Sequence, residues 1–175
     1  MFSSKGVSET GGKYIGYGIT DVKVVDIDVK ESDGSSTPML YVNLQEAKGE
    51  KTVSLRMAFS EKAQPYSMRK IKHLTTKVAT EAELDAIEEP TLTAYGAALF
   101  KLIGNKPVRM KFSGEEVIGT NGKKNFIKTV VNFPPFAEVI GGTTLTFDPS
   151  KDIKYLAPTA TTPTGAGKQT ADLPF

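Results

Sequence analysis

The chain has 175 residues, 39% of them hydrophobic, and a formal net charge of +2. This length allows one well-packed domain and a tail, and it is too short for two full cores. The sequence has no cysteine, which excludes disulfides and thiolate chemistry, and no apolar run approaches the roughly 20 residues of a membrane span. We therefore expect a soluble, cytoplasmic protein.

Glycine and serine dominate residues 1–18, where two tyrosines and a lysine interrupt them. Gly12-Lys13-Tyr14 is not a phosphate-binding P-loop, because Tyr14 stands where that motif needs Ser or Thr, and Val7 where it needs the first Gly. The segment is interpreted either as an arm leading into a strand or as an aromatic, basic loop beside a binding groove. In the second case Lys13, Tyr14 and Tyr17 would contact the ligand.

Alternation at period two predicts three strands, over 19–30, 39–45 and 52–59. The phase of the first strand slips between Val24 and Val25, which indicates a bulge. The second and third strands direct Tyr41 and Arg56 outward. Such a pattern fits either a plain solvated face or a binding surface.

Asp26 and Asp28 share one face of the first predicted strand. Two carboxylates on one face could hold a divalent ion for nuclease chemistry. The alternative is that they form the solvated face of a half-exposed strand, which is the commoner use of alternating acids.

Over 68–78, apolar residues recur at helical spacing in place of the alternation. Thr80 to Glu83 form a capping box that opens a short helix. A further helix is predicted to begin near residue 93 and to end at Gly104. His73, the one histidine, lies in the first of these helices. Without a second histidine or a cysteine it supports neither a zinc site nor a catalytic triad. We predict no metal, no cofactor and no enzymatic activity.

The stretch 106–133 alternates around Asn121-Gly122, which predicts a β-hairpin. On its first arm Val108, Met110 and Phe112 share the inward face, while Arg109, Lys111 and Ser113 share the outward one. Seven Lys or Arg and two Glu lie between residues 101 and 128, a local charge of +5. Such a concentration of positive charge points to a polyanionic partner.

Beyond residue 147 the composition shifts to Thr, Pro, Ala and Gly. We therefore expect a domain over 1–147 and a disordered tail over 148–175, because such a segment buries too little apolar surface to offset its ordering entropy. The last residues depart from that composition, and they are Asp172, Leu173, Pro174 and Phe175.

Three strands, a helical insertion over 63–104 and a hairpin form the element order of an OB-fold, a five-stranded Greek-key barrel with helices between strands three and four. Such barrels bind oligonucleotides on the outer face of strands two and three and on the adjacent loops, with aromatic side chains stacking on bases and cations following phosphates. Single substitutions to alanine at these outward positions are expected to leave the fold intact; the residues are Tyr41, Arg56, Arg109 and Lys111. The candidate contacts to single-stranded DNA are Lys13, Tyr14, Tyr17, Tyr41, Arg56, Arg109, Lys111, Lys123, Lys124 and Phe126.

In these features the chain resembles the single-stranded DNA-binding proteins, more particularly the OB-fold versions encoded by tailed bacteriophages. The strand order with the Lys-Pro-Val-Arg-Met-Lys-Phe hairpin carries the resemblance over about 15–140, and residues 172–175 look like the acidic tip of the bacterial family. The resemblance implies that the tip docks into basic-rimmed hydrophobic pockets on replication, recombination and repair proteins in the host cytoplasm. The chain departs from the bacterial pattern in having a single acid there and no tryptophan.

The main hypothesis is a non-enzymatic, sequence-tolerant binder of single-stranded DNA. One alternative is a metal-dependent nuclease that uses Asp26 and Asp28, or Glu115 and Glu116. A phage structural protein is another, although it would leave the +5 hairpin and the terminal Pro-Phe unexplained.

Overall fold

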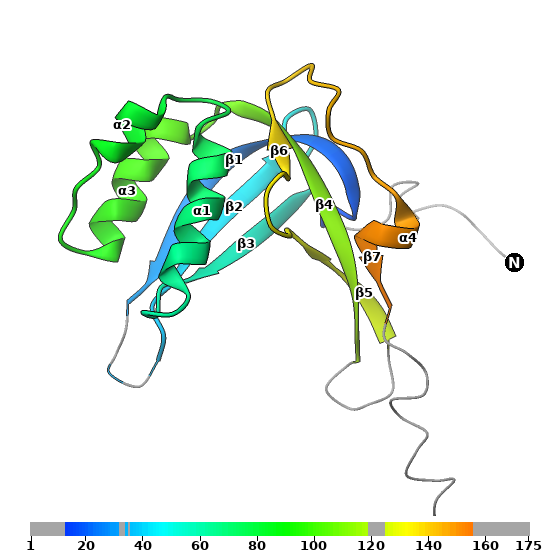
Figure 1. The fold of residues 1–175 in the computed structure, drawn as a ribbon, viewed down its shortest axis with the longest axis horizontal. Helices are drawn as coiled ribbons and strands as arrows, with labels where there is room; N and C mark the ends of the chain where they lie inside the picture. Colours follow the sequence, from blue (N-terminus) through cyan, green and yellow to red (C-terminus); the bar gives the residue numbers. More distant parts are fainter. Residues whose placement is uncertain (1–12, 32–33, 35, 119–124, 156–175) are drawn as a thin grey trace, which may run out of the picture.

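The computed structural model describes residues 13–31, 34, 36–118 and 125–155, and it is mainly β with a few short helices (Figure 1). The strands are β1 Gly18–Lys30, β2 Met39–Glu46, β3 Thr52–Ala58, β4 Pro107–Ile118, β5 Asn125–Val130, β6 Ala137–Glu138 and β7 Ile153–Lys154. The helices are α1 Gln64–Thr75, α2 Glu81–Asp85, α3 Leu92–Ile103 and α4 Pro149–Asp152.

All these strands form one open sheet, whose main path runs in the order β3-β2-β1-β4-β5. Every pairing along this path is antiparallel, which confirms the predicted hairpin of β4 and β5. The short strands β6 and β7 pair with β4 outside the path, and β7 runs parallel to it. As a result, β3 and β5 are the two ends of the sheet path.

A bulge in β1 confirms the predicted slip of phase. The register between β1 and β2 shifts between Val24 and Asp26, so that inward positions change parity there. Val24 is buried, whereas after the shift Asp26 is exposed and Ile27 packs against the core. The bulge therefore keeps an apolar side along the whole of this long strand.

The core lies between the inner face of the sheet and the helices α1 and α3. Val108, Met110 and Phe112 of β4 are at most 1% exposed, as the alternation predicted. Ile71 of α1 and Leu99 of α3 meet them in the same cluster. In Figure 1, α1, α2 and α3 lie together on one side of the molecule, and α4 and β7 lie on the opposite side.

Side-chain caps fix the helix ends that the sequence indicated. Thr80 and Glu83 form the predicted capping box of α2, and the Thr91 side chain accepts the N–H of Ala94 at the start of α3. Gly104 ends α3, as expected. None of the helices in the described part of the chain is long and apolar enough to cross a membrane.

Residues 148–155, predicted as the start of the disordered tail, are instead ordered against the sheet. Asp148 caps α4 by accepting the N–H of Ser150, and Ile153 pairs with Gly114 of β4 and is only 6% exposed. Composition averaged over the tail missed this contact, because a single apolar side chain meets a preformed strand there. The remainder of the predicted tail, 156–175, lies outside the described residues.

Candidate nucleic-acid interface

The two end strands of the sheet path face each other across a groove, which we call the β3–β5 groove. Its cavity volume is about 320 Å³. Both strands pair on one edge only along this stretch, β3 with β2 and β5 with β4. The groove is lined by Ser54, Leu55, Arg56, Met57, Lys70, Lys128, Thr129, Val130 and Val131.

The segment 13–15 connects β3 to β5 at one end of this groove. The N–H of Ile15 donates to the carbonyl of Thr52 at 2.9 Å, and the N–H of Thr52 donates to the carbonyl of Lys13 at 3.0 Å. The hydroxyl of Thr129 on β5 donates to the carbonyl of Ile15 at 2.9 Å. The two predicted candidates Lys13 and Tyr14 therefore lie beside the groove, where Tyr14 is 75% exposed.

Lys70 of α1 connects the chain after β3 to the chain after β5. Its ammonium group donates to the carbonyl of Val131 at 2.9 Å. Burial lowers the pKa of Lys70, since part of the hydration of the ammonium group is lost. Helix α1 thus places a half-buried cation in the wall of the groove.

Positive charge predominates in the groove. Its nine lining residues include the cations Arg56, Lys70 and Lys128 and no carboxylate. Arg56 and Lys128 are exposed and have no carboxylate partner among the described residues. A second cavity of about 310 Å³, beside the start of α3, is instead lined by Glu31 and Glu89. Of the two cavities, the β3–β5 groove is the one suited to a polyanion.

Tyr41 lies between this positive groove and a negative border on β1. The register places Asp28, Tyr41 and Arg56 in one row across β1, β2 and β3. The Asn43 amide donates to Asp28 at 2.8 Å and to Asp26 at 3.5 Å. An anionic ligand would therefore be attracted at Arg56 on β3 and repelled at Asp28 on β1.

The carboxylates of the nuclease alternative lie on two different strands, one pair on β1 and the other on β4. Within the described residues, no group of three or more His, Asp or Glu side chains could hold a metal ion. Asp26 and Asp28 lie on β1 beside Asn43, and the Glu115 carboxylate lies 3.7 Å from the Lys154 ammonium.

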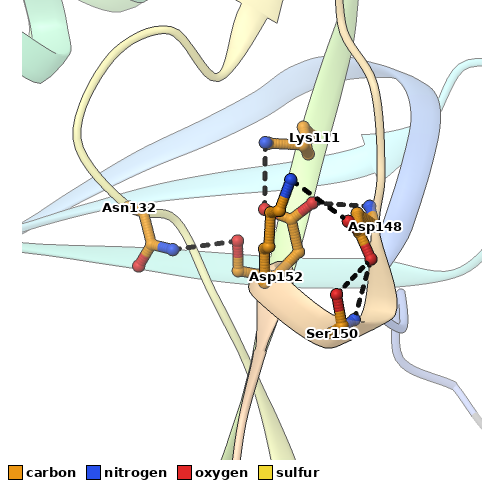
Figure 2. A network of polar contacts seen from close by, with 7 residues as sticks. Lys111, Asn132, Asp148, Ser150 and Asp152 are labelled. Carbon is orange, nitrogen blue, oxygen red and sulfur yellow. Dashed lines mark hydrogen bonds and ion pairs between the residues drawn. The ribbon is translucent and has the colours of Figure 1, made fainter.

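Arg109 and Lys111, the two cations predicted on the outward face of the hairpin, are held in ion pairs. Arg109 lies 3.4 Å from Asp21 and 3.2 Å from Glu138. Figure 2 shows Lys111 directed at Asp152, with an Nζ to Oδ1 distance of 3.0 Å. Carboxylates from β1, β6 and α4 thus pair with the two cations that were predicted to meet solvent.

Ser113, predicted outward like these two cations, is 2% exposed. Its hydroxyl accepts from the Asn132 amide at 3.0 Å. The outward face of the first hairpin arm is therefore partly interior, because the chain that follows β5 contacts it at Ser113.

The other predicted contacts divide between the groove and its surroundings. Phe126 is 54% exposed on β5, two residues from Lys128. Tyr17 is 47% exposed but stacks on Phe147, with ring centroids 5.9 Å apart. The candidates Lys123, Lys124 and the terminal Asp172, Leu173, Pro174 and Phe175 lie outside the described residues.

Sequence reasoning did not single out two of the groove cations, Lys70 and Lys128. Both belong to basic stretches of the sequence, but these stretches lie far apart in the chain. Lys70 and its partner Val131 differ by 61 positions. Only the packing of α1 beside the end of β5 brings them together. No local pattern could have identified Lys70 as a groove residue.

No protein-family model matches the chain, and a search of curated proteins finds no similar sequence.

Proposed function

We propose that the protein is a non-enzymatic, sequence-tolerant binder of single-stranded DNA that acts in replication, recombination or repair. The observation that carries the proposal is the β3–β5 groove, in which Arg56, Lys70 and Lys128 gather without a carboxylate. Cations of this kind neutralise phosphates irrespective of base sequence.

The strand order supports the OB-fold as the finer description of this domain. In the order β3-β2-β1-β4-β5, β3 and β5 are the ends that an OB-fold brings together to close its barrel. Segment 13–15 and Lys70 link these ends through side-chain and backbone hydrogen bonds. The helices α1, α2 and α3 follow β3 and precede β4, the place of the helix in that fold.

We also propose that residues 172–175 dock on other replication or recombination proteins. Leu173 and Phe175 supply apolar side chains for a hydrophobic pocket, and Asp172 supplies negative charge for its basic rim. Pro174 limits the backbone and so lowers the entropy lost on docking. This peptide is separate in sequence from every groove residue.

The DNA-binding proposal is tested by titrating fluorescent oligo-dT and a duplex of equal length at two salt concentrations. We expect tighter binding to the single strand and a steep loss of affinity as salt rises. Arg56→Ala and Lys128→Ala should each weaken binding and lower the magnitude of the salt slope by about 1, because each removes one phosphate contact.

Lys101→Ala is the matched control, since Lys101 is an exposed cation on α3 and does not line the groove. It changes the net charge equally and should leave affinity nearly unchanged. Equal or tighter binding to duplex at matched salt would contradict the proposal. Divalent-dependent cleavage of labelled DNA in the same samples would favour a nuclease instead.

A further inference from the structure

An exposed aromatic pair lies where α1 passes the chain that follows β5. Tyr66 of α1 is 52% exposed and Phe133 is 61% exposed. Their ring centroids are 5.9 Å apart, with 63° between the ring planes. In this edge-to-face arrangement the edge of one ring meets the face of the other, and each residue still keeps half or more of its surface open to solvent.

The pair adjoins the β3–β5 groove through Lys70. The ammonium group of Lys70, which lines the groove, lies 5.9 Å from the centroid of the Phe133 ring. The same group donates to the carbonyl of Val131, two residues before Phe133. Lys70 therefore holds the segment that carries Phe133 close to the positive wall of the groove.

We propose that Tyr66 and Phe133 form a stacking platform for an unpaired base of the DNA strand whose phosphates occupy the β3–β5 groove. The proposal deepens the DNA-binding function and rests on it. Bases stack on exposed aromatic side chains without regard to sequence, and a cation beside the ring adds attraction for the adjacent phosphate. Duplex DNA cannot use such a platform, because its bases are already stacked and paired.

Charge also favours this location over the outer face of β1 and β2. The acids Asp26 and Asp28 border Tyr41 on one side, whereas Lys70 borders Phe133. A strand held at Arg56 and Lys128 therefore meets less repulsion when it continues towards α1 than when it crosses β1. The platform thus predicts a path along the groove and onto α1.

The test compares Phe133→Ala and Tyr66→Ala with the unaltered protein on two probes of equal length, oligo-dT and an abasic deoxyribose-phosphate oligomer. We expect each variant to bind oligo-dT about 5- to 150-fold more weakly, because each loses one stacking contact with a base. Binding to the abasic oligomer and the salt slope on either probe should stay unchanged. Phe133→Tyr keeps the ring and should restore oligo-dT binding.

Tyr155→Ala is the control, because Tyr155 is also 61% exposed and follows β7. At Gly114 and Glu115, β4 pairs with both β5 and β7, so these two strands flank opposite edges of β4. Tyr155→Ala should therefore leave binding to both probes unchanged.

The possible failures are distinguishable. If the unaltered protein does not prefer single strands, the DNA-binding function itself is wrong. If it does, but both alanine variants bind oligo-dT normally, the platform is wrong and the function stands. An equal loss on oligo-dT and on the abasic oligomer would also overturn the platform, since the two rings would then act through packing.

Discussion

His73 shows at the scale of one residue how the helical insertion is held to β6 and the residue before it. Its Nε2 accepts the backbone N–H of Phe136 at 3.1 Å and that of Ala137 at 3.0 Å. The ring also packs edge-to-face on Phe136, with centroids 4.7 Å apart. Both hydrogen bonds need an unprotonated Nε2, so the fold selects the neutral imidazole.

This geometry makes stability depend on pH. Burial, followed by the charge of Lys77, lowers the pKa of His73 below its ordinary value of 6.5. The unfolded chain therefore binds a proton more readily than the folded chain. The free energy of unfolding rises with pH between the lowered pKa of the folded state and the ordinary value. The contribution of His73 is complete above about pH 6.5 and is lost as pH falls towards the lower, folded pKa.

We predict that the free energy of unfolding, measured with urea at pH 7 and pH 5, falls more in the unaltered protein than in His73→Gln. The glutamine oxygen can accept a backbone N–H at either pH, so the variant lacks this titration. His73→Leu leaves two N–H groups without an acceptor and should lose about 1–3 kcal/mol at pH 7. Identical pH dependence in the unaltered and glutamine proteins would show that His73 is not the titrating group.

At the scale of elements, α4 and β7 change the role of the hairpin cations. Asp152 of α4 binds Lys111 and also accepts the N–H of Asp148 at 2.8 Å. Burial opposes ionisation of Asp152, but the Asp148 N–H and the Lys111 ammonium outweigh it and leave its pKa below the ordinary value. Lys111 therefore links β4 to α4 and is not free to bind a phosphate.

We predict that Asp152→Ala lowers the free energy of unfolding by about 1–3 kcal/mol, because it leaves a partly buried ammonium group unpaired. Lys151→Ala is the control, since that side chain is 82% exposed in its pair with Asp148 and should cost at most about 1 kcal/mol. Urea unfolding at pH 7 measures both. Equal effects would mean that α4 contributes nothing through Asp152, and Lys111 would again be a candidate DNA contact.

At the scale of the whole molecule, the features that favour binding lie apart from those that hold the fold. The cations of the β3–β5 groove have no carboxylate partner among the described residues, whereas Arg109 and Lys111 on β4 are held in ion pairs. Residues 172–175, which lie outside the described residues, share no residue with either set. Binding to DNA and docking on proteins should therefore be separable by mutation.

We predict that deleting residues 172–175 leaves the affinity for oligo-dT unchanged or slightly tighter, because the acidic peptide can only compete with DNA for the positive groove. The same deletion should abolish capture of partner proteins from a host-cell lysate. Fluorescence titration and pull-down measure the two effects on one preparation. A truncated protein that retains the same partners, or that loses DNA binding, would contradict the proposed division.

Local pattern was sufficient to predict most of the elements. Alternation identified β1 with its bulge, β2, β3 and the hairpin, and the capping box identified the start of α2, because strand faces and helix caps depend on residues within one element. The inward faces of β3 and β4 follow for the same reason: each places every second side chain in the core.

Tertiary structure decided which cations remain available to a ligand. Arg56 and Arg109 look alike in the sequence, each an outward arginine on an alternating strand, yet Arg56 lines the β3–β5 groove and Arg109 pairs with Asp21 and Glu138. The difference depends on what packs beside each strand, and β6 meets β4 only after the chain has turned back on itself. The sequence by itself thus determined the faces of the strands, and only long-range packing decided which of those faces were left open, because electrostatic pairing depends on distance in space and not along the chain.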